Sequence, residues 1–516
     1  MKTYQLKIAI ILVAVSLSTI ACSDDFVNVD PKFENTDAFF NTPDDYNKTL
    51  IGAYDALQPT FWNVLLGEIA SDNTLAGGDP SKIDGPDTHT IDNMIPNDNN
   101  TLLRNIWQWN YVGLNRANYI LEFQDNIDFK GKDNIIGQAY FLRAYFAFEL
   151  VKWFGNVPLL TNNSSGTLRI LNSRIKPGDQ YTMNRIKDIP TGYALIEEDL
   201  KDAISKLNLT QNYEYQIGKG AAQALLGKVY LFHGKYDDSK FQLAADVLKD
   251  VIDSNVYSLV NDYNQIFENE NENNIESLFE VQYTNEPGVE WGCLQCGNGN
   301  VAVGYSGIRD YPSAAPFFFA GYGYNTPTQE AVDEFEMGDL RKEVAILDIV
   351  DWASKNNGVT YTLSRGETGY YNRKYLPRKK DYKTHGNFTL NNPNNYRAIR
   401  YADVLLMAAE ANNRKISADD SQAQDYLNQV RRRAFGVSDA SHDVTLSGTA
   451  LTDAIYHERR VELMGEGHRF FDLVRTDKAA QSIPGFTTNK NEIFPIPLVE
   501  LELANAVERW GQNPNY

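Results

Sequence analysis

Residues 220–252 read GAAQALLGKVYLFHGKYDDSKFQLAADVLKDVI, and this stretch sets the expected fold class. Small residues at positions 221, 227, 234, 244 and 245 are interleaved with leucine and tyrosine. Small side chains let two helices approach closely, while the larger side chains fill the groove between them. The stretch therefore predicts a helix, a turn and a second helix packed against the first.

Helical spacing continues on both sides of this stretch. The predicted pair resembles the tetratricopeptide unit, a helical repeat whose copies stack into a scaffold. Elsewhere apolar residues recur three or four positions apart, which places them on one face of a helix. This spacing predicts helices at residues 107–121, 135–153, 401–413, 422–435 and 451–464. The chain is thus expected to be mainly α-helical, with tetratricopeptide-like helical pairs that form a scaffold.

The middle of the chain differs from the helical segments in composition and periodicity. Residues 281–325 are rich in glycine and aromatic residues and lack a helical period, and residues 71–100 are dense in Asp, Asn, Gly and Pro. Loops of this kind on a rigid scaffold are where binding usually resides. A strand or hairpin is predicted at residues 360–375. We therefore expect an irregular, loop-rich ligand-binding lobe with short β-hairpins at about residues 260–390.

The N-terminus has the layout of a secretory signal. Lys2 and Lys7 precede an apolar run at residues 8–20 that is too short to span a bilayer, and Cys22 follows a small residue. This predicts a signal peptide at residues 1–21 and lipidation of Cys22, with residues 22–516 as a single body. The alternative is an ordinary cleaved signal peptide and an incidental cysteine.

Charge and cysteine content narrow the function classes. The formal net charge is -20, which argues against nucleic acid as a partner because phosphate binding needs a basic face. Apart from Cys22, the chain contains only Cys293 and Cys296. In an exported protein this pair predicts a small disulfide loop. A redox-active pair and half of a zinc site are the alternatives.

The commonest local catalytic signatures are absent from the sequence. His457 and Glu458 begin like a zinc-protease helix, but Val461 stands where the second histidine would be. The chain has neither a Gly-x-Ser-x-Gly elbow nor a phosphate-binding Gly-x-x-x-x-Gly-Lys-Ser/Thr loop. We therefore expect no enzyme activity, no cofactor and no metal site.

Several separated strings together resemble one family, the SusD/RagB group of nutrient-binding outer-membrane lipoproteins of starch-utilisation-type systems. Their order agrees with the family over essentially the whole chain. The strings are GQAYFLRAY at 137–145, WFGNVP at 153–158, RYADVLLMAAEA at 400–411, ERRVEL at 458–463, GHRFFDLVR at 467–475, FPIP at 494–497 and QNPNY at 512–516.

The resemblance implies a role in nutrient uptake. It implies a protein of the cell exterior, attached to the outer membrane through a lipid, that binds a glycan and delivers it to a SusC-like TonB-dependent outer-membrane transporter. A peptide-binding surface lipoprotein of the same uptake system is the alternative in the same scaffold, and a structural partner of the transporter is a further one. The matched residues Arg143, Glu410, Glu458 and Arg475 are expected to form salt bridges that fix helix packing.

Candidate ligand contacts follow from the chemistry of a sugar. A sugar ring offers an apolar face and a rim of hydroxyl groups, so its receptor needs aromatic rings beside polar groups. Relatives often place polar ligand contacts in the earlier loop tract, at the positions of Asp72 and Asn73. No tryptophan lies between Trp62 and Trp107, which argues against starch itself. The predicted ligand-binding residues are Asp72, Asn73, Trp291, Tyr305, Arg309, Tyr311, Tyr322, Tyr324 and Asn325.

Overall fold

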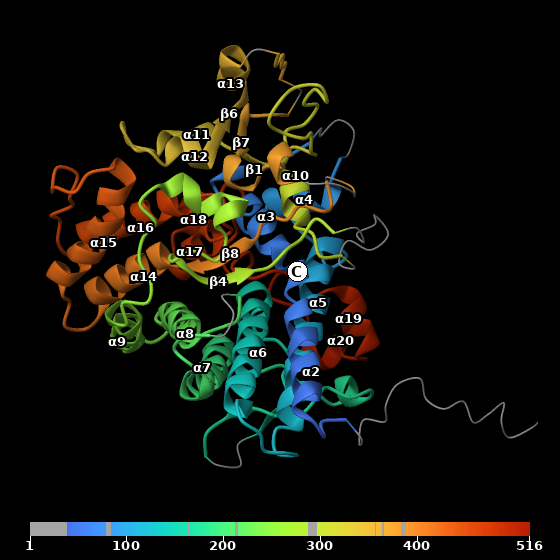
Figure 1. The fold of residues 1–516 in the computed structure, drawn as a ribbon. Helices are drawn as coiled ribbons and strands as arrows, with labels where there is room; N and C mark the ends of the chain where they lie inside the picture. Colours follow the sequence, from blue (N-terminus) through green and yellow to red (C-terminus); the bar gives the residue numbers. More distant parts are fainter. Residues whose placement is uncertain are drawn as a thin grey trace, which may run out of the picture.

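The computed structural model of the 516-residue chain describes residues 39–78, 84–162, 166–211, 215–286, 297–356, 358–363, 366–382, 387 and 389–516. Helices dominate these ranges and the strands are short, which confirms the predicted mainly α-helical class (Figure 1). Across the same ranges, no helix combines the length and the apolar character that crossing a membrane requires.

The long helices form a scaffold in which each helix packs against the next in the series. They are α2 (Pro43–Asp55), α5 (Thr101–Glu122), α6 (Lys132–Phe154), α7 (Ile189–Lys206), α8 (Lys219–His233), α9 (Lys240–Asp253), α14 (Tyr401–Arg414), α15 (Asp420–Phe435) and α16 (Gly448–Glu462). The packing runs in this order from α2 to α14, which contacts both α15 and α16. Figure 1 shows the series bending from the lower centre of the molecule to its left side. This is the solenoid-like stacking of helix pairs that the sequence predicted.

Each predicted helix coincides with one of these elements, except that the helix predicted at 451–464 ends at Glu462, and small residues bring the pairs together. A Cβ atom at Gly227 of α8 would lie 2.5 Å from Leu248 of α9, and one at Gly113 of α5 would lie 2.3 Å from the Phe146 ring of α6. Real Cβ atoms do not approach other atoms so closely. Glycine at these two positions therefore lets the paired helices pack in contact.

Polar side chains fix where several helices begin. The Asn100 side chain accepts hydrogen bonds from two backbone N–H groups in the first turn of α5, and Asp188 and Asp419 each accept one at the start of α7 and α15. These caps satisfy N–H groups that have no partner within the helix.

Buried ion pairs join the helices, as predicted for the matched residues. Arg143 of α6 and Asp199 of α7 form a pair at 2.7 Å, and Arg475 binds Glu410 of α14 at 2.6 Å. Glu458 of α16 binds Arg341 at 2.7 Å. Each carboxylate here compensates a buried guanidinium, so these bonds connect elements that are distant in the sequence.

Short antiparallel strand pairs and short helices make up the rest of the fold. The pairs are β1 (Thr74–Gly77) with β5 (Tyr324–Pro327), β2 (Thr161–Asn162) with β3 (Arg169–Ile170), β4 (Ser277–Val281) with β8 (Tyr396–Arg400), and β6 (Ile346–Asp348) with β7 (Tyr370–Asn372). The short helices are α3 (Phe61–Ile69), α4 (Pro86–Asp92), α10 (Val301–Ser306), α11 (Gln329–Asp333), α12 (Lys342–Ala345), α13 (Ile349–Lys355), α17 (Arg469–Arg475), α18 (Ala479–Ser482), α19 (Leu498–Leu503) and α20 (Val507–Trp510).

Two segments differ in detail from the prediction. The segment 360–375 contains β7, but its partner β6 lies earlier in the chain, so the strand pair encloses α13 instead of forming a hairpin within the segment. The glycine-rich tract 281–325 contains the short helix α10. Local periodicity does not reveal a partner strand more than twenty residues away, and a helix of 6 residues is too short to show a period.

The upper part of Figure 1, which holds α11 to α13, has its own small hydrophobic cluster around Ile308, Leu347 and Tyr371. A group of buried ions connects this part to the scaffold. We call Glu462, Arg341, Arg400 and Arg433 the ionic cluster. The Glu462 carboxylate of α16 accepts hydrogen bonds from Arg341 at 2.9 Å and Arg433 at 2.6 Å, and also binds Arg400.

Candidate functional site

Three tyrosine rings meet where α10 and β5 come together. We call Tyr305, Tyr322 and Tyr324 the tyrosine cluster. The ring centroids of Tyr305 and Tyr324 are 5.6 Å apart with an interplanar angle of 30°, and those of Tyr322 and Tyr324 are 6.3 Å apart with an angle of 17°. The sequence predicted each of these residues as an aromatic platform. The structure places them together.

The scaffold side of the cluster is closed and the other side is partly open. Trp62 of α3 is buried, and its ring centroid lies 5.6 Å from that of Tyr305. Tyr324 is only 5 % exposed, whereas Tyr305 and Tyr322 are half-buried. Tyr305 and Tyr322 are therefore the rings that can present an apolar face to a ligand.

A carboxylate from the earlier loop tract links the cluster to Arg309. The Tyr324 hydroxyl donates to Asp84 Oδ1 at 2.8 Å, and the Arg309 guanidinium donates to Asp84 Oδ2 at 2.6 Å. Arg309 also donates to the backbone carbonyl of Tyr322 at 3.0 Å. A guanidinium and a carboxylate thus stand beside the aromatic rings, the combination that a hydroxylated ring requires.

The protonation states of these groups suit the recognition of hydroxyl groups. Burial lowers the pKa of Arg309, but the hydrogen bond and the charge of Asp84 outweigh burial and raise the pKa above its usual value. Burial raises the pKa of Tyr305 to about 12. At neutral pH, Arg309 is therefore a cation and Tyr305 carries a hydroxyl proton that it can donate.

Two glycines let the loops close around Tyr324. Gly85 is the N-cap residue of α4 with φ of 62°, and a Cβ atom there would lie 2.9 Å from the Tyr324 ring. Gly77 has φ of 71° and lies opposite Tyr324 across the strand pair, where a Cβ atom would be 2.0 Å from the carbonyl of Gly323. Both positions need a backbone conformation that L side chains rarely adopt. At the cluster, the glycines thus serve close packing.

Asp72 and Asn73 are engaged in ion pairs and hydrogen bonds. Asp72 accepts a hydrogen bond from Arg469 Nε at 2.7 Å and lies 3.2 Å from Arg460 Nη2. Asn73 is fully buried, and its Oδ1 accepts a hydrogen bond from Arg460 Nε at 2.9 Å. These contacts fasten the loop before β1 to α16 and α17.

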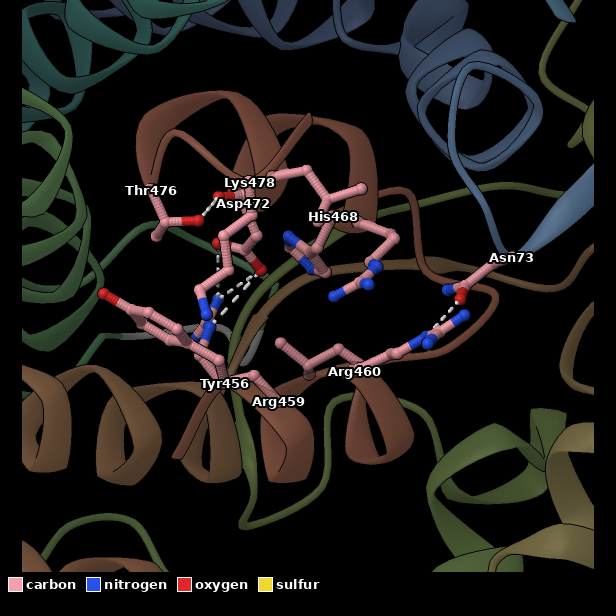
Figure 2. Close-up of a pocket in the computed structure, with 11 residues that line it drawn as sticks. Asn73, Tyr456, Arg459, Arg460, His468, Asp472, Thr476 and Lys478 are labelled. Carbon is pink, nitrogen blue, oxygen red and sulfur yellow. Dashed lines mark hydrogen bonds and ion pairs between the residues drawn. The ribbon is translucent and has the colours of Figure 1, made fainter. Parts of the chain in front are cut away.

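The pocket beside Asn73 is narrow and lined by charged side chains. Figure 2 shows Asn73 facing Arg460 at one end of this pocket and Asp472 facing Arg459 at the other. Its volume is about 20 Å³, which holds about one water molecule and no sugar ring. Burial and the nearby charge of Lys228 lower the pKa of His468 in this pocket to about 3, so its imidazole is neutral.

The strand pair separates these residues from the tyrosine cluster. Asn73 immediately precedes β1, and Gly77 at its far end lies opposite Tyr324. A strand rises about 3.3 Å per residue, so Asn73 lies about 13 Å from the level of Tyr324. The structure therefore brings the two loop tracts together, but it does not bring Asp72 and Asn73 to the aromatic rings.

Tyr311 and Asn325 lie inside the protein. Tyr311 is 3 % exposed, packs in the small hydrophobic cluster, and donates from its hydroxyl to the carbonyl of Pro316 at 2.6 Å. Asn325 is fully buried with φ of 60°, and its amide lies 3.4 Å from the Ser306 hydroxyl. Their side chains support the loops that carry the tyrosine cluster.

Four predicted residues, Trp291, Cys293, Cys296 and Cys22, lie outside the described residues. Within the part of the chain that the structure describes, no group of three or more His, Cys, Asp or Glu side chains is arranged to hold a metal ion.

Asp84 is a site residue that sequence reasoning missed. It falls within the predicted loop tract 71–100, but that tract contains many Asp and Asn residues that are equally polar. The signal is its position directly before Gly85, the N-cap residue of α4, which packs against Tyr324. This position identifies Asp84 as a site residue only once the two loop tracts are known to meet.

The helical scaffold and the loop-built tyrosine cluster define a class of helical-repeat proteins with an aromatic surface mounted on loops. Residues 350–495 match the SusD family, and residues 25–231 match a family described as starch-binding and associating with the outer membrane. The chain belongs to the SusD family, as the resemblance had indicated.

Similar proteins cover nearly the whole chain. The SusD-like protein P2 of Formosa agariphila is 27% identical over 532 residues, which is 97% of each chain. A solved laminarin binding SusD-like protein is 32% identical with a TM-score of 0.78, and the match covers 92% of this chain and 100% of that one. Surface glycan-binding protein A from Bacteroides fluxus is 26% identical, with the same TM-score and the same coverage.

Proposed function

We propose that this protein captures a glycan at the tyrosine cluster and delivers it to a SusC-like TonB-dependent transporter. The observation that carries the proposal is the Asp84 carboxylate, which holds Tyr324 and Arg309 together beside the partly open rings of Tyr305 and Tyr322. Membership of a family with glycan-binding relatives supports the same conclusion.

The side chains of the tyrosine cluster suit a sugar. Tyr305 and Tyr322 would stack on the apolar faces of sugar rings, and their hydroxyl groups would bind ring hydroxyls. Arg309 would donate to sugar oxygens with the N–H groups that Asp84 leaves free. Trp291 remains a predicted further platform in the same lobe.

Laminarin is the first ligand to test. The solved relative that is 32% identical is named for binding it. The lack of a tryptophan between Trp62 and Trp107 argues against starch. The relatives named above give no support to the peptide alternative, so a peptide library serves as the negative arm of the test.

We further propose that the protein is anchored at the cell exterior. Lipidation of Cys22 would attach the single body 22–516 to the outer membrane, where the acidic residues after Cys22 serve as a tether. The match to a family described as associating with the outer membrane supports this location. A Cys293–Cys296 disulfide would stiffen the loop that carries Trp291 and reduce the entropy lost on binding. Thiol labelling of the purified protein before and after reduction tests that bond.

The test is a binding titration with laminarin and with soluble starch. Tyr305→Ala and Tyr322→Ala are each expected to weaken laminarin binding at least about tenfold, which corresponds to about 1.4 kcal/mol. Tyr181→Ala is the matched control, because Tyr181 is 54% exposed on a different part of the surface. If both cluster variants bind laminarin with the affinity of the wild-type protein, the binding site lies elsewhere. Capture of peptides but of no glycan would overturn the proposal.

We also propose that the protein does not cleave what it binds. Prolonged incubation with laminarin should release no new reducing ends. Accumulation of reducing ends at a rate proportional to protein concentration would establish hydrolysis and overturn this part of the proposal.

A further inference from the structure

A second cavity lies in a different part of the fold from the tyrosine cluster. Its volume is about 410 Å³, within the range of about 300–1,000 Å³ that small-molecule sites occupy. It lies between the ends of α6, α7, α8 and α17 and the chain near residue 490. We call it the helix-end cavity. The residues that matter here are Tyr193, Phe232, Tyr236, Phe471, Lys490 and Glu492.

Aromatic rings form one wall of the helix-end cavity. The ring centroid of Tyr193 lies 6.4 Å from that of Tyr236 and 6.2 Å from that of Phe232. Tyr236 is 47 % exposed, so much of its ring is open to a ligand. A wall of this kind offers the flat apolar surface on which sugar rings stack.

A tyrosine hydroxyl in this cavity makes no hydrogen bond to the described residues. Tyr193 is only 5 % exposed and lines the cavity, yet its hydroxyl makes no hydrogen bond to any described residue. The Tyr193 hydroxyl oxygen is not fully buried, so it can bind a water or a ligand in the cavity. Tyr236 lines the same cavity, and its hydroxyl also has no partner in the described part of the chain.

The charges around the cavity are largely compensated within the protein. Lys152 binds Glu149, Lys235 binds Asp477, and both bonds are 2.7 Å long. Arg475 binds Glu410 at 2.6 Å. With these cations neutralised, the cavity has no concentrated positive charge with which to select a phosphate or a carboxylate.

Lys490 and Glu492 complete the polar lining. Lys490 lies over the Tyr516 ring with its Nζ 4.8 Å from the centroid, and Glu492 accepts a hydrogen bond from the Asn489 backbone at 2.9 Å. One ammonium and one carboxylate add opposite charges, so a neutral ligand with both donors and acceptors fits this lining best. A sugar hydroxyl group is both a hydrogen-bond donor and an acceptor.

We propose that the helix-end cavity is a second sugar-binding site, which takes a neutral hexose unit of the glycan that the tyrosine cluster captures. The two sites share no residue. In Figure 1, α7 and α8 lie in the lower half of the molecule, whereas α10 and β1 lie in the upper half. This inference rests on the proposed function, because it assumes that the ligand is a glycan.

The test counts the sites for a short probe. Laminarihexaose is titrated calorimetrically into wild-type protein, with cellohexaose and maltohexaose as parallel probes. Two equivalents are expected to bind. Tyr193→Phe removes only the unpartnered hydroxyl, and Tyr236→Ala removes an exposed ring, so both variants should fold. Each is expected to weaken one equivalent at least about tenfold and to leave the other unchanged. Tyr181→Ala is the control.

The outcomes separate this inference from the proposed function. If the wild-type protein binds one equivalent of probe and only Tyr305→Ala abolishes that binding, the second site is overturned and the proposed function stands. If the wild-type protein binds one equivalent and only the Tyr193 and Tyr236 variants abolish that binding, the helix-end cavity is supported as a sugar site and the tyrosine cluster is overturned as one. The absence of binding with all three probes would overturn both.

Discussion

The Tyr324 hydroxyl donates to Asp84 at 2.8 Å, although the two residues stand 240 positions apart in the sequence. The bond joins two loop tracts that meet at the β1–β5 strand pair. Each tract supplies part of the site, Asp84 from one and the tyrosine rings from the other. The site therefore depends on the long-range fold as well as on the composition of either loop.

Asp84→Ala should weaken glycan binding about tenfold or more. The change removes the acceptor of the Tyr324 hydroxyl and leaves Arg309 without its carboxylate, so neither group keeps its position. Titration with laminarin measures the effect. Asp84→Asn should be intermediate, because an amide oxygen can still accept from Tyr324. Asp125→Ala, at an exposed aspartate, is the control, and equal affinities across all these variants would refute the role of Asp84.

Gly85→Ala should lower both stability and glycan affinity. The residue has φ of 62°, and a Cβ atom would lie 2.9 Å from Tyr324, so conformational strain and a steric clash act together. Strain of this kind costs about 1–3 kcal/mol. Gly131→Ala is a matched control, because Gly131 also has a positive φ but a Cβ atom there would have no neighbour within 4 Å. If both variants keep full affinity in the titration, close packing at Gly85 is not needed for binding.

Glu462→Ala should strongly destabilise the protein. The carboxylate is fully buried and binds three buried arginines, each of which would lose one of its carboxylate partners in the variant. Removal of one partner from a buried ion pair costs about 3–5 kcal/mol. Thermal unfolding followed by circular dichroism measures the loss against Glu508→Ala, a substitution at an exposed position. A melting temperature equal to that of the control would show that the ionic cluster does not hold the fold together.

The protein should lose stability in acid. Burial alone would raise the pKa of Glu466, but the charges of Arg400 and Lys374 lower it from 4.5 to about 2. A carboxylate with a depressed pKa contributes stability that is fully present above its unfolded-state pKa and is lost as the pH falls toward its folded-state pKa. Melting temperatures should therefore decline as the pH falls from about 4.5 toward 2. Glu466→Gln should flatten this decline, and an equally steep decline in that variant would assign the effect to other groups.

Cys22→Ser should release the protein from the membrane. The substitution removes the thiol that would carry the lipid, and no helix within the described residues could hold the protein in a bilayer. Fractionation of cells that express each form measures the distribution, and protease treatment of intact cells reports surface exposure. Membrane association that survives the substitution would favour an ordinary cleaved signal peptide and attachment through a partner.

Much of the fold was predictable because it is encoded locally. The helices at 107–121 and 135–153 follow from the three-to-four spacing of apolar residues, and the pair at 220–252 follows from small residues such as Gly227. The strand pairs were harder to predict from the sequence. β6 and β7 belong to one pair, but the 21 residues between them include α13, and no local signal connects them.

The candidate site was predictable in part for the same reason. Tyr305, Tyr322 and Tyr324 stand in one glycine-rich tract, so their composition alone pointed to an aromatic surface. Asp84 belongs to the other tract, and its role depends on a tertiary contact. Asp72 was proposed as a ligand contact, and that prediction is untested. In the structure its carboxylate is bound to Arg469, and the local sequence does not predict this bond.

The register of the β1–β5 pair constrains how proteins of this kind can change their ligand. Gly77 stands opposite Tyr324, and a shift of one residue would turn each side chain of the strand to the other face. An insertion in either strand would therefore misplace Tyr324 relative to Asp84. Ligand preference can diverge most readily through point substitutions on the open side of the cluster, at Tyr305 and Tyr322, while the strand pair stays fixed.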